Sequence, residues 1–245
     1  MAFSCSPLGA ALFILTVPTA ATAQSLGPGS SEGLSVAPVQ LSLADARRSV
    51  STKVTNPGST PITVQVRLYA WSMRGEEEVY APATDIGFSP PLFRLQAHGT
   101  QVVRVVAKTP PGPVERSYRL IVDQLPLANV SGQLQLPVRM VLPVFIEPAA
   151  GAPRTPQLEW SARYQPQGGR VIITVVNHGG VHARLVNLSA EDGQGAVPVA
   201  PGLAGYALAH QSRDWAYKPA RVPTSLTITA EGGASPIRVT VPVTR

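Results

Sequence analysis

The stretch from Gln133 to Phe145 limits most strongly what this chain can fold into. Its polar and apolar side chains alternate, which is the period of a β-strand with one buried face. The apolar members of the row are Leu134, Leu136, Val138, Met140 and Leu142. Proline at position 137 favours a place at a sheet edge, because proline cannot donate a hydrogen bond to a neighbouring strand. The stretch therefore predicts an edge strand.

This edge strand has two interpretations. In the first, the apolar row packs into the protein's own core, and Pro143 ends the strand. In the second, the edge stays available so that another chain can add a strand to it, the binding mode called β-augmentation. An unprotected apolar edge otherwise invites aggregation, so a free edge needs an occupant. The alternation by itself fits both interpretations.

The rest of the chain repeats the β pattern in shorter runs. The sequence has 25 Pro and 21 Gly among 245 residues, and no run of ten or more residues shows the 3.6-residue period of a helix. Strands are expected at residues 34–43, 49–56, 62–71, 100–107, 115–125, 158–160, 170–176, 181–188, 205–209, 225–230 and 237–243. Residues 85–95 are expected to cross between strands.

Two domains of similar kind follow from this pattern. The Pro/Ala/Gly-rich segment 148–157 is expected to link a first domain, 34–147, to a second, 158–245. Both read as Ig-like antiparallel β-sandwiches, so the fold class is all-β.

Residues 1–23 have the features of a secretory signal peptide. They contain no charged side chain, include an apolar run and end in the Ala-Thr-Ala pattern of a cleavage site. The mature chain is expected to begin at Gln24, with a flexible lead-in over residues 24–33. The only cysteine, Cys5, lies inside the signal, so the mature chain would hold no disulfide. An uncleaved anchor is the alternative; no other segment is long enough to span a membrane, so a protein that is not membrane-embedded is expected.

The titratable side chains indicate no enzyme. Hydrolase elbows, zinc-protease motifs and phosphate-binding glycine loops are absent from the sequence. His178 and His182 flank a Gly-Gly turn and are expected at its surface rather than on a zinc ion. Residues 76–78 are three glutamates without the spacing of a calcium loop, which favours a solvated hairpin tip. The formal charge of +6 is scattered, so no nucleic-acid partner and no cofactor are expected.

Four segments form a pattern along the first half of the chain. They are Asn56-Pro-Gly, Ser89-Pro-Pro-Leu-Phe-Arg-Leu95, the run from Glu115 to Pro126, and Leu142-Pro-Val-Phe-Ile-Glu-Pro148. Their order and spacing resemble the periplasmic chaperones of bacterial pilus and fimbria assembly, the PapD-like family. The resemblance implies a boomerang of two Ig-like domains. It also implies a chaperone that completes pilus or fimbrial subunits with its own strand, by donor-strand complementation, and delivers them to an outer-membrane usher.

The resemblance also implies where a subunit would bind. The donated side chains would be Leu134, Leu136, Val138 and Met140. The family anchors the subunit's terminal carboxylate with two basic residues, and those positions here hold Gln40 and Pro143. Arg139 and Arg119 are candidate substitutes; the alternative for each is an ordinary exposed strand arginine. The uncharged anchor positions fit a divergent branch of the family.

Three functions remain to be compared. The leading hypothesis is a periplasmic chaperone, which in the free state could also pair two apolar edges into a dimer. The second is a secreted two-domain Ig-like adhesion or structural module, in which the apolar row is self-buried. The third is an envelope hydrolase, which would depend on one of the four histidines.

Overall fold

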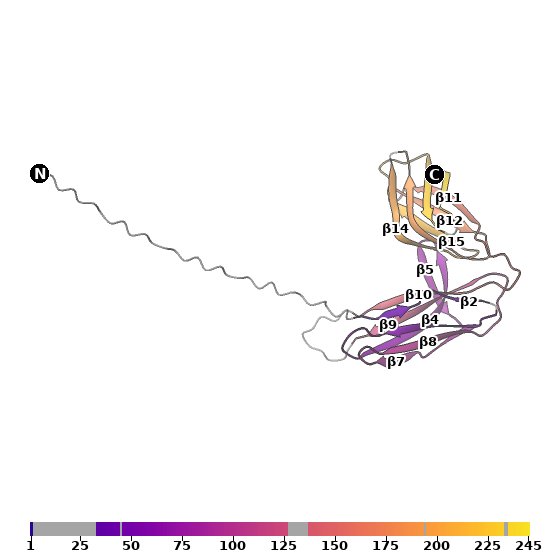
Figure 1. Ribbon diagram of the computed structural model, residues 1–245. Helices are drawn as coiled ribbons and strands as arrows, with labels where there is room; N and C mark the ends of the chain where they lie inside the picture. The colour runs from indigo at the N-terminus through magenta and orange to yellow at the C-terminus, as the bar shows by residue number, and fades with distance from the viewer. Residues whose placement is uncertain (2–32, 45, 127–136, 194, 233–234) are drawn as a thin grey trace.

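The computed structural model describes residues 1, 33–44, 46–126, 137–193, 195–232 and 235–245. These residues form strands and turns and no helix, so the described part holds no helix that could cross a membrane. Two β-sandwiches meet at a bend, one built from β1 to β10 and the other from β11 to β17 (Figure 1). The all-β class and the two-domain arrangement are thus confirmed. The residue limits given above for each domain stay a prediction.

The first sandwich pairs two sheets. One has the order β1-β3-β8-β6, and the other has the order β2-β10-β9-β4-β5 with β7 beside β4. The strands are β1 (Ser35–Ala37), β2 (Leu41–Leu43), β3 (Ser49–Thr55), β4 (Ile62–Arg74), β5 (Glu77–Pro82), β6 (Ile86–Ser89), β7 (Leu92–Leu95), β8 (Thr100–Ala107), β9 (Arg116–Leu125) and β10 (Arg139–Ile146). Alternate residues of each sheet face inward, as the period of two requires. Val54, Val64, Val103, Leu120 and Val144 are fully buried between them.

The second sandwich is one sheet curled around its own core, with the order β14-β13-β16-β17-β11-β12-β15. The strands are β11 (Leu158–Gln165), β12 (Arg170–Asn177), β13 (Ala183–Glu191), β14 (Ala196–Ala207), β15 (Ser212–Tyr217), β16 (Ser225–Glu231) and β17 (Ile237–Thr244). Two tryptophans, Trp160 and Trp215, stack inside it with ring centroids 6.1 Å apart.

Several segments differ from the sequence expectations, among them β5, which was not expected as a strand. Residues 85–95, expected as a crossing, contain the short strands β6 and β7. β14 begins at Ala196 rather than near 205, although two prolines and a glycine interrupt its first half. β15 was not expected, because its Ser-Arg-Asp-Trp-Ala-Tyr sequence lacks clean alternation. Pro143 lies inside β10 and does not end it.

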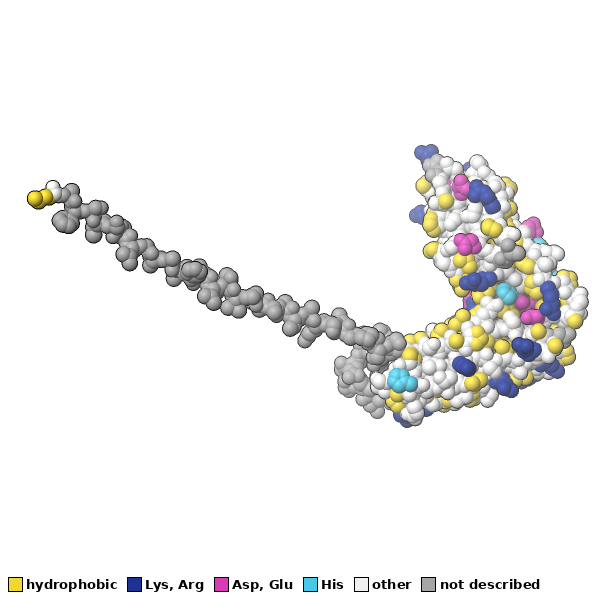
Figure 2. Space-filling model, in the orientation of Figure 1, with side chains coloured by type: hydrophobic (Ala, Val, Ile, Leu, Met, Phe, Trp, Pro, Cys, Tyr) yellow, Lys and Arg dark blue, Asp and Glu magenta, His cyan; other side chains and the backbone are white. Residues whose placement is uncertain are grey.

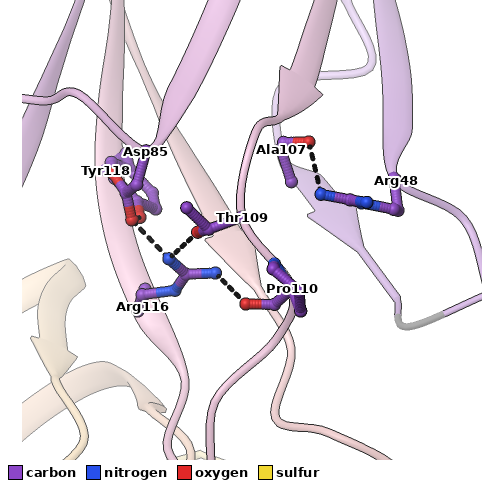
Figure 3. A network of polar contacts seen from close by, with 7 residues as sticks. All are labelled: Arg48, Asp85, Ala107, Thr109, Pro110, Arg116 and Tyr118. Atoms are coloured by element: carbon purple, nitrogen blue, oxygen red, sulfur yellow. Dashed lines mark hydrogen bonds and ion pairs between the residues drawn. The ribbon is translucent and has the colours of Figure 1, made fainter.

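A polar network holds the start of β9 against the neighbouring loop. Arg116 donates hydrogen bonds to the Thr109 hydroxyl at 2.7 Å and to the Pro110 carbonyl at 2.9 Å, and it forms an ion pair with Asp85 (Figure 3). The Tyr118 hydroxyl donates to the same Asp85 carboxylate at 2.6 Å. Burial, followed by that hydrogen bond, raises the pKa of Tyr118. The network holds β9 in place, and β9 is the strand with which β10 pairs.

Candidate functional site

β10 has one fully paired side and one partly open side. It pairs antiparallel with β9 along its whole length, from Arg139 to Ile146. On its other side, the described residues pair only at Val144 to Ile146, in parallel with β2. From Arg139 to Pro143, β10 is therefore an open edge among the described residues.

The hydrogen-bond parity of β10 shows which backbone groups face this edge. The Gln124 N–H donates to the Val138 carbonyl at 2.9 Å, and the Glu147 N–H donates to the Leu43 carbonyl at 2.9 Å. Because hydrogen-bonded pairs alternate in an antiparallel ladder, even residues of β10 bond to β9 and odd residues point away from it. Arg139 and Val141 therefore direct their N–H and C=O groups outward. Pro143 is tolerated inside the strand because its nitrogen also faces away from the β9 ladder.

The apolar row of β10 faces the core of the first domain. Leu142, Val144 and Ile146 are buried there, whereas Val138 and Met140 are half-buried and pack against the rim of the core. Two of the expected donor residues, Leu134 and Leu136, lie outside the described residues. Along β10, burial of the apolar side chains therefore decreases from Ile146 toward Val138.

Charged side chains line the opposite face beside the open edge. The Asp123 carboxylate, with its side chain 10% exposed, accepts hydrogen bonds from Arg139 Nε and from an Arg67 Nη, each at 2.5 Å. Burial raises the pKa of Asp123, but the bonds and charges of the two arginines outweigh it and hold the pKa below its ordinary value. A cavity of about 530 Å³ is lined by these three residues together with Gln65 and Val138, among others.

The two expected anchor positions, Gln40 and Pro143, lie on neighbouring strands close to Arg119. Pro143 is opposite Arg119 in the β9–β10 ladder. Gln40 and Pro143 each directly precede the first paired residues of β2 and β10, which are Leu41 and Val144. Gln40 is exposed and Pro143 is buried. The structure therefore brings Gln40 and Pro143 together, and the guanidinium of Arg119 is the positive charge on the strand position opposite Pro143.

Arg119 is buried and already paired. Its side chain is 9% exposed, and it donates to both oxygens of Glu78, at 3.1 Å from Nε and 2.5 Å from an Nη. Its guanidinium lies 3.5 Å from the centroid of the Trp71 ring. The Tyr80 hydroxyl donates to Glu78 as well, and burial followed by this bond raises the pKa of Tyr80 to about 12. Arg119 is thus not an exposed strand arginine, whereas Arg139 is 62% exposed.

Aromatic side chains around Phe145 join the two domains. Phe145 and Trp71 from the first domain pack with Tyr206 from the second, and all three are buried. His182 stacks on Phe145 with ring centroids 3.7 Å apart, and its Nδ1 lies 2.8 Å from a Glu115 oxygen. The expectation of His182 at a turn surface is therefore wrong, because its ring fills the domain interface. His178 does lie at an exposed turn, beside Glu159.

The expected glutamate tip is not simply solvated. Glu78 is bound to Arg119, and Glu76 accepts the Ala216 N–H from the second domain at 3.2 Å. Among the described residues, no group of three or more His, Cys, Asp or Glu side chains could hold a metal ion. Sequence reasoning did not find Glu78, Asp123 or Glu115 as site residues. The strand register, which sets Asp123 opposite Arg139, could have revealed Asp123.

The acidic and basic side chains on the visible face are dispersed, and the inner side of the bend is hollowed (Figure 2). Two Ig-like sandwiches, a bend between them and an open strand edge beside the bend are the features of a two-domain chaperone fold.

Residues 33–152 match the family described as the pili and flagellar-assembly chaperone, PapD N-terminal domain. Residues 33–152 belong to the PapD-like pilus and fimbrial chaperones, as a divergent member of that family. These are periplasmic chaperones and not enzymes. The comparison with curated proteins found no match.

Solved structures share the fold at low sequence identity. A chain of the CsuC–CsuE chaperone–tip adhesion subunit pre-assembly complex, from the archaic chaperone-usher Csu pili of Acinetobacter baumannii, is 21% identical with a TM-score of 0.68, covering 86% of this chain and 99% of its own. The YadV chaperone is 14% identical with a TM-score of 0.63, covering 85% and 98%. A chain of the Salmonella enterica SafA pilin complex with the SafB chaperone is 17% identical with a TM-score of 0.58, covering 84% and 95%.

Proposed function

We propose that this protein is a periplasmic chaperone that caps pilus or fimbrial subunits by donor-strand complementation and delivers them to an outer-membrane usher. The observation that carries the proposal is the open edge of β10, where Arg139 and Val141 direct backbone donors and acceptors outward. Such groups bind an added strand with little regard for its sequence, and alternate apolar side chains then select the groove. Solved complexes of a similar fold pair a chaperone with a pilin or with a tip adhesion subunit.

The donated side chains are proposed to be Val138 and Met140, continued by Leu134 and Leu136. Each apolar side chain that a subunit buries contributes about 1.5–3 kcal/mol. Val138 and Met140 are half-buried, so part of their surface remains to be covered by a partner. A chaperone that covers an exposed apolar groove also keeps the subunit from aggregating.

Arg139 is proposed as the charged contact at the edge. Asp123 fixes its Nε, and its side chain is 62% exposed. Its exposed guanidinium is thus available to a partner that lies along β10, and a guanidinium binds a carboxylate through two parallel bonds. Arg119 is bound to Glu78, and it is proposed to stabilise the strands next to Gln40 and Pro143 rather than to bind the subunit directly.

The main test changes the open edge and spares the β9 ladder. Val141→Pro removes one outward N–H, in the way that Pro143 already does two residues further on. Val141→Ala keeps that N–H and is the matched control. Both variants are co-expressed with candidate secreted subunits, and subunit recovery and thermal unfolding are measured. The proposal predicts at least about tenfold lower recovery for Val141→Pro, because a lost hydrogen bond and a clash oppose strand addition. Equal recovery by the two variants would overturn it.

A secreted two-domain Ig-like module without chaperone activity is the second candidate. It is favoured by the burial of Leu142, Val144 and Ile146 in the protein's own core. Under this alternative no subunit is recovered with the parent protein. Val138→Asp separates the two functions less cleanly than Val141→Pro, because Val138 also packs against that core. If the free chaperone pairs its edges into a dimer, Val141→Pro should convert the dimer to a monomer in sedimentation.

Residues 1–23 are proposed to direct export and then to be cleaved off after Ala23. Residues 2–32 lie outside the described residues, so the support comes from the sequence and from the periplasmic family. Mass spectrometry of the protein from a periplasmic fraction should give a chain that begins at Gln24. A chain that keeps residues 1–23 would contradict cleavage.

A further inference from the structure

The outer face of the β1-β3-β8-β6 sheet carries positive charge, and none of these four strands contains Asp or Glu. Every second residue of β8 is exposed on this face, among them Val102, Arg104 and Val106. Lys53 of β3 is exposed on the same face, since it lies opposite Val102 in the β3–β8 ladder. Two cations and two apolar side chains therefore share one surface.

A third cation, Lys108, follows β8 directly and lies across the same face. A Cβ at Gly87 of β6 would lie 3.0 Å from the Lys108 Cε and 3.7 Å from its Nζ, so the lysine side chain passes over the Gly87 backbone. Gly87 is opposite Val106, which places the ammonium group on the face that Val106 occupies. The Asp85 carbonyl accepts the Lys108 N–H, but the Asp85 carboxylate is already paired with Arg116.

This basic face, formed by Lys53, Arg104 and Lys108, does not protect a sheet edge, because β3 and β8 are the inner strands of their sheet. Lys53 and Arg104 are diagonal neighbours in the ladder, and like charges in such positions repel one another. The face also points away from the second domain, since Trp71 and Phe145, which contact that domain, belong to the other sheet. A partner on the basic face would therefore leave the open edge of β10 accessible.

We infer that the basic face binds the surface of an anionic lipid bilayer. Its cations contact lipid phosphates, and each Lys or Arg near such a surface strengthens binding roughly fivefold. Val102 and Val106, which are 44% and 40% exposed, enter the headgroup region between them. A protein partner fits less well, because protein interfaces are depleted in lysine and enriched in aromatic residues. The aromatic residue of these strands, Phe88, packs against the core instead.

The test needs no subunit and uses the mature chain from Gln24, so that the apolar run of residues 1–23 cannot itself bind lipid. The protein is sedimented with vesicles of phosphatidylglycerol and phosphatidylcholine, or of phosphatidylcholine alone. The inference predicts binding to the anionic vesicles only, weakened by added salt. The variant Lys53→Gln/Arg104→Gln/Lys108→Gln should bind them at least about tenfold more weakly, because three phosphate contacts are lost. Its thermal unfolding should match that of the parent, since all three side chains are exposed.

The matched control removes three exposed cations of the second domain. Arg163→Gln/Arg184→Gln/Lys218→Gln lowers the net charge by the same amount and should bind anionic vesicles within about threefold of the parent. Equal losses in the two triple variants would show that net charge, and not the basic face, attracts the protein. A parent that binds both kinds of vesicle equally, or neither, would overturn the inference.

A second comparison separates a bilayer from an acidic protein. Val102→Ser/Val106→Ser should weaken vesicle binding several-fold, whereas Val197→Ser/Val222→Ser, which changes exposed valines of the second domain, should not. Equal vesicle binding by these two variants would contradict a face that enters the headgroups. Binding of the parent to poly-glutamate but not to vesicles would overturn the inference and assign the face to an acidic protein. None of these results involves a subunit, so the Val141→Pro comparison decides the proposed function separately.

Discussion

Asp123 ties the open edge strand to the rest of its sheet. Its carboxylate, on β9, bridges Arg67 of β4 and Arg139 of β10, so one buried acid joins three neighbouring strands. The arrangement holds Arg139 at the edge without a contact from another chain. A carboxylate between two arginines is stabilised in its charged form, although its burial opposes that form.

We predict that Asp123→Asn lowers the free energy of unfolding by about 1–3 kcal/mol at neutral pH, because the two arginines lose the negative charge and one of the two oxygens that accept their hydrogen bonds. The folded-state pKa of Asp123 is lowered, so its contribution is present above the unfolded pKa of about 4 and is lost as the pH falls through the folded pKa. Denaturant unfolding at several pH values measures this. Parent and variant should converge in acid; a difference that stays constant down to pH ~2 would contradict the account.

The individual charged residues could be predicted only in part. Arg139 is a candidate from the sequence because it shares the odd-position parity of Pro143, and Arg119 is a candidate because it lies on the preceding strand. Their partners were not expected, since Glu78 and Asp123 come from strands whose register the sequence does not reveal.

At the scale of elements, the β4–β5 hairpin fastens the first domain to the second. Its tip reaches the edge strand β15 (Figure 1), where the Gly75 carbonyl accepts the Asp214 N–H at 3.0 Å. The Met73 N–H donates to Gln211 Oε1 at 2.8 Å, and Glu76 accepts the Ala216 N–H. The hairpin therefore covers the edge of β15 and sets the bend at the same time.

We predict that Glu76→Ala with Gln211→Ala loosens this bend. Each change removes a side-chain to backbone hydrogen bond, which contributes about 1 kcal/mol. Small-angle X-ray scattering should show a wider range of inter-domain distances, and unfolding should shift by a few degrees. Thr227→Ala is the control, because Thr227 bonds to Thr240 within the second domain. Identical scattering from the double variant and the parent would contradict the role of the hairpin.

β10 was predicted well as an alternating strand and less well as an element with two different sides. The period of two gave the inward face, which Leu142, Val144 and Ile146 confirm. The sequence could not tell that β2 pairs with only the last three residues of β10, since that depends on a parallel contact with a distant segment. For the same reason the sequence indicates Pro143 as a possible strand end, whereas in the structure its nitrogen faces the open side and the strand continues.

At the scale of the whole molecule, the two-domain plan was predictable and the domain interface was not. Repeated short alternating runs and a Pro-rich linker are local signals. The aromatic contact of Phe145 with His182 and Tyr206 is not local, because its members are distant in the chain. The interface sets the bend between the two domains.

The central claim is that a subunit adds a strand to the open edge of β10. Amide hydrogen exchange of the free chaperone and of its subunit complex tests this directly at Arg139 and Val141, whose N–H groups face outward. The account predicts fast exchange in the free protein and at least about tenfold slower exchange in the complex, while the inward amides of Met140 and Leu142 are protected in both. Fast exchange at Arg139 and Val141 in a saturated complex would contradict it.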